Sequence, residues 1–202
     1  NPNCTSTRGT MSSPAVTAIS AEPSRPVSTF SVCPAANSKV RMLNAATRTV
    51  ALDLADATAA RQGKGMRVGT VTRGGATLAF THAADRLTIT LDRPSTADEV
   101  IELVVRYDGI AADGLHITQT KYGDRTFFSD DWPDKARQWL PTVDHIADKA
   151  TMEMDVIAPA HYQVVSNGRR VEETDLPGDT RRTVWRESVP IAPWLYTLGV
   201  AR

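Results

Sequence analysis

Residues 66–91, MRVGTVTRGGATLAFTHAADRLTITL, decide the fold class of this chain. Short runs rich in β-branched residues alternate there with turn residues, and within residues 86–91 leucine and isoleucine alternate with threonine. A two-residue period puts alternate side chains on the same side of the backbone, as in a strand with one buried face. Gly74 and Gly75 separate two of the runs and tolerate the positive φ values of a tight hairpin turn. The stretch therefore predicts antiparallel sheet.

The same pattern continues along most of the chain, so we expect an all-β protein whose antiparallel sheets stack as a β-sandwich. Asn167-Gly168 and Pro177-Gly178-Asp179 are turn sequences that follow apolar runs. A single helical turn is expected within residues 134–139. The predicted strands cover residues 49–54, 66–72, 76–82, 86–91, 99–107, 115–119, 151–158, 162–166, 180–186 and 195–200.

Residues 1–38 differ from the rest in composition. They are dominated by Ser, Pro, Thr and Ala and carry few charges, which is typical of a leader or linker. Within them, residues 16–22 and 27–32 flank a Pro-Ser-Arg-Pro sequence and are compatible with one short hairpin. We therefore divide the chain into an N-terminal segment, residues 1–38, and an antiparallel β-domain, residues 39–202.

Composition excludes several classes of function. The chain has 202 residues, of which 41% are hydrophobic and 23% charged, as in ordinary globular proteins. Lys and Arg together number 23, as do Asp and Glu, so the formal net charge is zero. Because no excess of positive charge is present to collect phosphates or anionic lipids, neither nucleic acid nor membrane is expected as a partner. The longest apolar stretches are too short to span a bilayer.

Cys4 and Cys33 are the two cysteines of the chain. They are expected to be either two free thiols or one disulfide, because two thiols without nearby histidines do not make a zinc site. No charged segment followed by an apolar signal core is visible, so the chain is expected to be cytoplasmic, or secreted or periplasmic and already processed.

Motifs of self-contained catalysis are absent from the sequence. None of the four histidines begins the His-Glu-x-x-His spacing that places two zinc ligands and a general base on one helix face. Neither a Gly-x-Ser-x-Gly elbow nor a phosphate-binding Walker loop occurs. We therefore expect no catalytic residue and no metal ligand in this chain, and no hydrolysis by the chain alone. The histidines are His82, His116, His145 and His161.

Two further groups of residues suggest chemistry but are better explained by structure. Asp144 and His145 are adjacent, and neighbours in an extended segment point to opposite faces, so hydrogen bonding within the fold or a surface loop is favoured over a shared site. Met152 and Met154, two residues apart, are expected on the core face of one strand rather than at a metal.

Residues 127–144, FFSDDWPDKARQWLPTVD, hold the densest mixture of chemical groups in the chain. A core strand would not carry so many charges, and a solvated loop would not carry so many aromatic rings. Such a mixture is typical of a segment that lines a cleft or an interface between domains.

The same region resembles a known family. ARQWLPTVD, followed by DKAT, is similar to the aminopeptidase N segment written Ala-Arg, aromatic, Pro-Cys-x-Asp, then Lys-Ala-x-Phe. Thr142 stands where that family often has Cys, and we interpret it as a small core residue. Segments similar to the later strands of the family's N-terminal domain occupy residues 162–168, 185–187, 190–192 and 195–200, and the resemblance covers residues 48–202.

The resemblance implies a saddle-shaped β-domain that packs on a thermolysin-like zinc domain. The zinc ligands and the general base would then lie beyond Arg202, so zinc is expected in a catalytic domain outside this chain. The implied partners are that catalytic domain and the N-terminus of a peptide substrate. A domain separated from its partner would also expose an apolar patch, through which self-association is expected.

One family residue of the N-terminal domain is implied at position 132. An acid or amide five residues before the arginine matched to Arg137 holds the free α-amine of the substrate, and here that position is Trp132. An indole offers an ammonium group only a cation–π contact of about 0.5–2 kcal/mol, so Asp131 or Asp130 would have to supply a negative charge. We expect Asp130, Asp131 and Trp132 to face the substrate N-terminus, although a role in domain packing alone stays open.

The alternative function is a stand-alone β-sandwich module for binding or adhesion, because a fold does not fix a function. A His-Glu-x-x-His sequence encoded downstream of Arg202 would favour the peptidase domain, and a stop codon there would favour the module.

Overall fold

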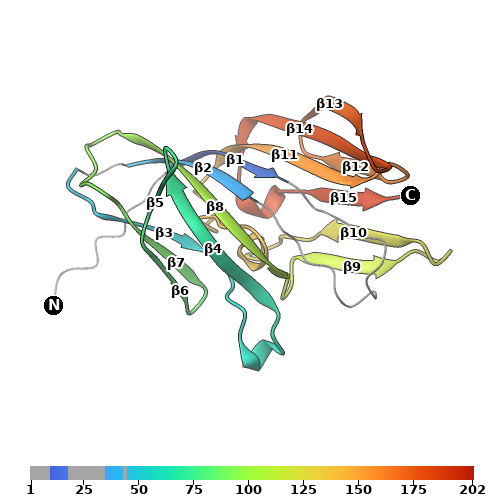
Figure 1. Ribbon diagram of the computed structural model, residues 1–202, viewed down its shortest axis with the longest axis horizontal. Helices are drawn as coiled ribbons and strands as arrows, with labels where there is room; N and C mark the ends of the chain where they lie inside the picture. The colour runs from blue at the N-terminus through green and yellow to red at the C-terminus, as the bar shows by residue number, and fades with distance from the viewer. Residues whose placement is uncertain (1–9, 18–34, 43–44) are drawn as a thin grey trace.

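Three β-sheets make up the part of the chain that the computed structural model describes, namely residues 10–17, 35–42 and 45–202 (Figure 1). Between the strands lie three single-turn 3-10 helices, η1 (Ala59–Arg61), η2 (Ala136–Gln138) and η3 (Pro193–Leu195). Within these described residues no helix is long and apolar enough to cross a membrane. The all-β prediction is confirmed.

The large sheet has eight strands in the order β13-β14-β11-β1-β2-β8-β4-β5. Every pair of neighbours is antiparallel except β1 and β11, which run parallel. The sheet therefore cannot be a simple meander, because β1 joins two halves that are far apart in sequence. Its strands are β1 (Thr10–Thr17), β2 (Ala35–Arg41), β4 (Gly65–Arg73), β5 (Ala76–Thr77), β8 (Val100–Ile110), β11 (Ala150–Pro159), β13 (Arg169–Leu176) and β14 (Thr180–Ile191).

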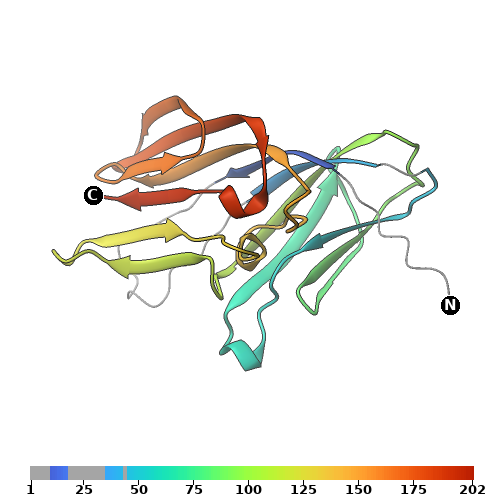
Figure 2. The same ribbon diagram turned by 180° about the vertical axis from the view of Figure 1, so that it is seen from behind.

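Two smaller sheets pack at the ends of the large one. The three-stranded sheet has the order β3 (Thr49–Asp53), β7 (Arg86–Thr90), β6 (Phe80–Ala83), and β6 contacts β4. The four-stranded sheet has the order β12 (Gln163–Ser166), β15 (Leu198–Ala201), β10 (Arg125–Ser129), β9 (Leu115–Gln119), and β12 contacts β14. A long sheet with a smaller sheet at each end gives the saddle-like outline that Figure 2 shows from behind.

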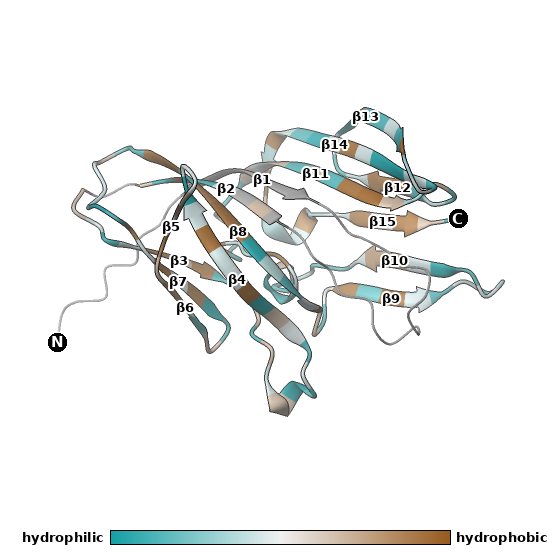
Figure 3. Cartoon of the chain, viewed as in Figure 1, coloured by the Kyte–Doolittle hydropathy of each residue, from teal (hydrophilic) through white to brown (hydrophobic). Residues whose placement is uncertain are grey.

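The core is one continuous apolar cluster that draws on all three sheets. Strand β8 shows why these residues form a sheet: Ile101, Leu103, Val105 and Tyr107 are buried, and the residues between them lie nearer to solvent. Figure 3 shows both hydrophobic and hydrophilic stretches along β8. Burial of one residue in two is the source of most of the sheet's stability.

Most of the predicted strands agree with the structure to within a few residues. The Gly74-Gly75 turn is confirmed, since both residues have positive φ between β4 and β5. The predicted turn at residues 177–179 is confirmed in the same way by Gly178 and Asp179. The predicted strand 76–82 is instead divided into β5 and β6, which belong to different sheets. The sequence does not predict β10, which runs into the aromatic and acidic stretch, or β13, in which charged residues dominate.

The first part of the chain contributes more structure than its composition suggests. Strand β1 lies between β11 and β2 in the large sheet, and β2 pairs with β8 along its whole length. A boundary after residue 38 therefore falls inside β2. Both strands are rich in small residues without strong alternation, so their backbone pairing is not visible as a hydrophobic pattern. Residues 18–32 of the predicted hairpin lie outside the described residues, and so do both cysteines.

Candidate functional site

A row of four residues crosses the outer face of the four-stranded sheet and includes two exposed apolar side chains. His116 on β9 is opposite Phe128 on β10, Phe128 is opposite Gly199 on β15, and Gly199 is opposite Val165 on β12. Residues that pair directly lie in one row on the same face of a sheet. Phe128 is 45% exposed and Val165 53% exposed, while the ring of His116 stacks on that of Phe128 with centroids 5.0 Å apart.

The opposite face of this sheet belongs to the core. Phe127, Val164 and Val200 are buried and form the neighbouring row, one residue out of phase with the exposed one. An edge-to-face contact joins Phe127 to Tyr162, and the Trp185 indole on β14 donates a 3.0 Å hydrogen bond to the carbonyl oxygen of Val164. The inner face of the sheet is therefore apolar and covered, whereas the outer face exposes Phe128 and Val165 among polar residues such as Thr118 and Gln163.

The end of this sheet carries two stacked tryptophans. Trp132 follows β10 and Trp194 lies in η3, immediately before β15; their ring centroids are 4.2 Å apart and their planes differ by 27°. Trp132 is 58% exposed, and Leu195, which follows Trp194 in sequence, is also exposed. The two loops meet because β10 and β15 are neighbours in the sheet. Ser129 Oγ accepts a 2.9 Å hydrogen bond from the Leu198 amide and donates one of 3.2 Å to the Tyr196 carbonyl oxygen.

Asp131 points away from this surface. Its side chain is almost completely buried, and Oδ1 accepts a 2.8 Å hydrogen bond from the buried indole of Trp139, whereas Oδ2 has no hydrogen-bond partner. Burial raises the pKa of the Asp131 carboxyl to about 8 because charge is disfavoured away from water, with the nearby carboxylate of Asp144 adding to the effect. The carboxyl is therefore mostly protonated at neutral pH.

Asp130 takes the opposite orientation and reaches solvent. Its Oδ2 lies 3.7 Å from the ammonium group of Lys135, which is also 3.4 Å from Oδ2 of Asp113. Its backbone amide donates a 2.7 Å hydrogen bond to the carbonyl oxygen of Gly114, which fixes the start of the loop. Of the three residues expected to face a substrate, the structure thus places Asp130 and Trp132 at the surface and Asp131 behind them.

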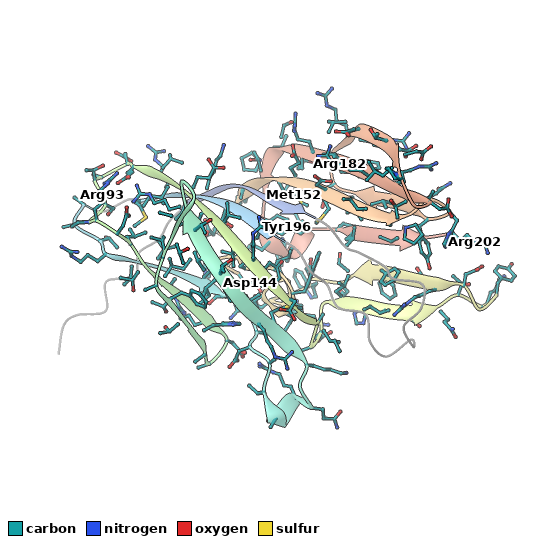
Figure 4. The ribbon with its side chains drawn as sticks, in the orientation of Figure 1. Arg93, Asp144, Met152, Arg182, Tyr196 and Arg202 are labelled. Atoms are coloured by element: carbon teal, nitrogen blue, oxygen red, sulfur yellow. The ribbon has the colours of Figure 1, made fainter. Side chains whose placement is uncertain are left out.

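Arg137 and Asp144 connect this loop to the core. The Arg137 backbone amide and Nε each lie 3.1 Å from Oδ2 of Asp144, and its terminal nitrogen donates to the Asp144 carbonyl oxygen at 2.9 Å. The Asp144 amide in turn donates to a carboxylate oxygen of Asp53 at 3.1 Å. Figure 4 shows Asp144 in the middle of the molecule, consistent with its burial. The expectation that Asp144 acts in structural hydrogen bonding is confirmed.

Three other residues selected from the sequence also lie in the buried interior of the fold. Met152 and Met154 are buried in the core face of β11, as predicted. In addition, Arg170, Arg181 and Arg182 of the β13–β14 hairpin pair with acids of the same region, and Arg182 contacts both Asp155 and Glu172. Thr142 is buried, as expected for a small core residue. Within residues 10–17, 35–42 and 45–202 no group of three or more His, Cys, Asp or Glu side chains is arranged to hold a metal ion.

Two features of the site were not predicted from the sequence. Trp194 is 62 positions from Trp132, and no local pattern indicates that the two rings meet. The exposed row across the four-stranded sheet also depends on a register that places residues from four separate strands side by side.

Comparison with known proteins identifies the family. The model of the Peptidase M1 N-terminal domain matches residues 18–195. No curated protein matches the sequence. A two-domain M1 zinc metallopeptidase bound to L-tryptophan has a similar fold, with a TM-score of 0.77 and 20% identity over 96% of this chain and 43% of that chain. An M1 zinc metallopeptidase from Deinococcus radiodurans has a TM-score of 0.72 and 22% identity, over 94% of this chain and 42% of its own.

A more distant likeness leads to the same fold. Yeast LTA4 hydrolase has a TM-score of 0.71 and 17% identity, over 96% of this chain and 30% of that chain. This chain therefore spans less than half the length of each of these solved structures. Because the family model covers most of the sequence and the fold agrees along nearly its whole length, the chain belongs to the family of Peptidase M1 N-terminal domains.

Proposed function

We propose that this chain is the non-catalytic N-terminal domain of a zinc metallo-aminopeptidase, that it packs on the catalytic domain, and that it lines the site for the substrate N-terminus. One observation carries the proposal: the exposed apolar row of the four-stranded sheet runs beside the stacked pair of Trp132 and Trp194. Family membership and the zinc metallopeptidases among the similar structures support it.

Packing on another domain accounts for the exposed row. Phe128, Val165 and Leu195 expose large apolar surfaces from three segments of the same sheet end. Single exposed apolar residues are common on monomers, but a contiguous group that includes aromatic rings is typical of an interface. The expected occupant is the catalytic domain, whose arrival would bury this surface.

The zinc ion would belong to that catalytic domain. The described residues hold no cluster of ligands, and the sequence lacks the His-Glu-x-x-His motif, so the part of the chain that the structure describes does not fit a zinc site. The chemistry of hydrolysis would accordingly come from outside this chain, and this domain would contribute shape and contacts.

Trp132 and Asp130 are the groups that would contact the α-amine of a substrate. The exposed indole offers a cation–π contact, and the Asp130 carboxylate offers an opposite charge that Lys135 only partly neutralises at 3.7 Å. Asp131 would support them from behind, because its carboxyl is buried against Trp139. In place of one anchoring side chain for the α-amine, the chain would offer an aromatic contact from Trp132 and a partly screened acidic contact from Asp130.

The experiment is steady-state hydrolysis of amino-acyl anilides by the full-length protein and its variants. A cation–π contact of about 0.5–2 kcal/mol predicts that Trp132→Ala raises KM about 2- to 30-fold with little change in kcat. Asp130→Asn should raise KM less, since the carboxylate is exposed and screened. Tyr122→Ala is the matched control, because Tyr122 is exposed at the far end of the β9–β10 hairpin. Unchanged KM and kcat in both site variants would contradict the role in substrate binding.

A further inference from the structure

Trp194 covers one face of the Trp132 ring and leaves the other uncovered. The two indoles are close to parallel, with centroids 4.2 Å apart, which is the separation of rings in direct contact. Trp132 is more than half exposed while Trp194 is half-buried, so Trp194 is the inner ring of the pair and Trp132 the outer one. An aromatic ring fixed in this way presents a single open face.

The inner ring is held by a rigid turn. Pro193 and Ala192 are buried beside it, the Leu195 amide donates to the Ala192 carbonyl oxygen at 2.9 Å, and the Tyr196 amide donates to that of Pro193 at 3.0 Å. Proline fixes its own φ angle, so this turn has little backbone freedom. The Ser129 hydroxyl ties the turn to the end of β10 through its bonds with Tyr196 and Leu198.

The outer ring has weaker support of its own. Its neighbour Asp131 is anchored through the Trp139 indole, and the Lys135 amide donates to the Asp131 carbonyl oxygen at 3.0 Å, so the backbone at Trp132 is fixed. The side chain, by contrast, is mostly in solvent and would sample several rotamers without a partner. Trp194 is the one ring among the described residues that stacks on it.

We propose that Trp194 is a positioning residue, which holds the indole of Trp132 so that its open face meets the ammonium group of the substrate. This inference rests on the proposed function, in which Trp132 lines the substrate site. A cation–π contact requires the cation over the face of the ring, so its strength depends on ring orientation. Loss of Trp194 would let Trp132 rotate and would weaken substrate binding without removing any group that touches the substrate.

A double-mutant cycle in the full-length protein tests this inference. Trp194→Ala should raise KM for amino-acyl anilides by about the factor seen for Trp132→Ala, roughly 2- to 30-fold, and should leave kcat within about 2-fold. The double variant should be no worse than Trp132→Ala alone, because both changes remove the same contact. Trp194→Phe should keep most of the affinity, since a phenyl ring preserves the stack.

Each other result has a defined meaning. A KM effect in Trp132→Ala together with an unchanged KM in Trp194→Ala, or with effects that multiply in the double variant, would overturn the positioning role alone. An unchanged KM in Trp132→Ala would overturn the proposed substrate contact, and the positioning role with it. A fall in kcat that Trp194→Phe does not rescue would show a merely structural role for Trp194 and would also overturn the inference.

A spectroscopic measurement checks the stack without any substrate. Closely stacked indoles give a coupled pair of circular-dichroism bands, which should disappear in both Trp132→Ala and Trp194→Ala. The matched control is Trp185→Phe, because Trp185 hydrogen-bonds to β12 and belongs to no aromatic pair among the described residues. Bands that survive Trp194→Ala would contradict the geometry on which the inference depends.

Discussion

The indole of Trp139 donates a 2.8 Å hydrogen bond to Asp131, and this is the one polar contact that the buried Asp131 carboxyl makes through its side chain among the described residues. The bond places a protonatable group directly behind the exposed Trp132. Stability and site geometry are thus linked in one loop.

Replacement of Asp131 by asparagine should stabilise the protein increasingly as the pH rises. Burial raises the pKa of Asp131 to about 8, above the ordinary value for an unfolded chain, so between about pH 4 and pH 8 the folded state holds a proton that the unfolded chain has released. Stability therefore falls as pH rises through this window, by up to about 6 kcal/mol in total. The amide oxygen of the introduced asparagine would still accept from Trp139, and the amide carries no charge.

Urea unfolding at a series of pH values measures this effect. The difference in unfolding free energy between variant and wild type should be small near pH 4 and should grow toward pH 8. A difference that stays constant over this range would show that Asp131 is not buried in a neutral form.

Removal of the Arg137 guanidinium should leave Asp144 as an uncompensated charge. Asp144 is 5% exposed, the Arg137 guanidinium donates to its Oδ2 and to its carbonyl oxygen, and burial raises the pKa of its carboxyl. We expect Arg137→Met to lower the unfolding free energy by about 2–4 kcal/mol at neutral pH, the range for breaking a buried pair after allowance for partial exposure of the arginine. Chemical denaturation measures this.

The control for that variant is Arg186→Ala, which breaks an exposed pair with Glu153 on the surface of the large sheet. Exposed pairs contribute less than about 1 kcal/mol, so the control should be close to wild type. Equal losses in the two variants would contradict a special role for the Arg137–Asp144 pair.

Two glycines with the same backbone angle should respond differently to alanine. Gly168 has φ +80° and a Cβ atom there would lie 2.0 Å from the Arg186 carbonyl oxygen, whereas Gly178 has φ +81° and no atom within 4 Å. Gly178→Ala should cost about 1 kcal/mol from the backbone angle alone, and Gly168→Ala at least about 2 kcal/mol more because β14 must move. Thermal unfolding of the two variants checks this, and similar losses would show that the β13–β14 hairpin yields easily.

The uncovered face of the four-stranded sheet should make the 202-residue chain self-associate at high concentration. Replacement of Phe128 and Val165 by Ser removes the two large apolar side chains of the row, while Val100→Ser, on β8 of the large sheet, is the matched control. Sedimentation analysis should show association in the wild type and the control and less in the double variant. A wild-type chain that stays strictly monomeric would contradict the prediction that this exposed surface associates with another apolar surface.

The sequence predicts the parts of the fold that depend on local patterns. Strands β3, β7 and β9 agree with their predicted ranges because alternation and turn residues define them locally. The glycine turn after β4 agrees with its prediction for the same reason. Strand β1 and the first four residues of β2 fall in the segment whose composition predicts a linker, because small residues pair through the backbone without leaving a hydrophobic period. The division of residues 76–82 between two sheets depends on tertiary packing, which a period of two does not encode.

The candidate site can be predicted only in part, because some of its contacts join residues that are far apart in the sequence. The aromatic and acidic stretch 127–144 is visible in one segment of sequence, and the family resemblance that it carries implies Asp130, Asp131 and Trp132 as site residues. The inward orientation of Asp131 depends on the buried Trp139, and the stack on Trp194 depends on the pairing of β10 with β15. Neither relationship is local, and neither could be derived before the fold was known.

The most direct test of the central claim is cysteine accessibility on the outer face of the four-stranded sheet. With Cys4 and Cys33 replaced by Ser, Phe128→Cys and Val165→Cys would be labelled with a maleimide in the 202-residue chain and in the full-length protein, with Val100→Cys as the control on the large sheet. Docking of a catalytic domain predicts that the first two positions react at least about 10-fold more slowly in the full-length protein, because an interface core excludes water and reagent. The control should react equally in both. Equal rates at all three positions would contradict the account.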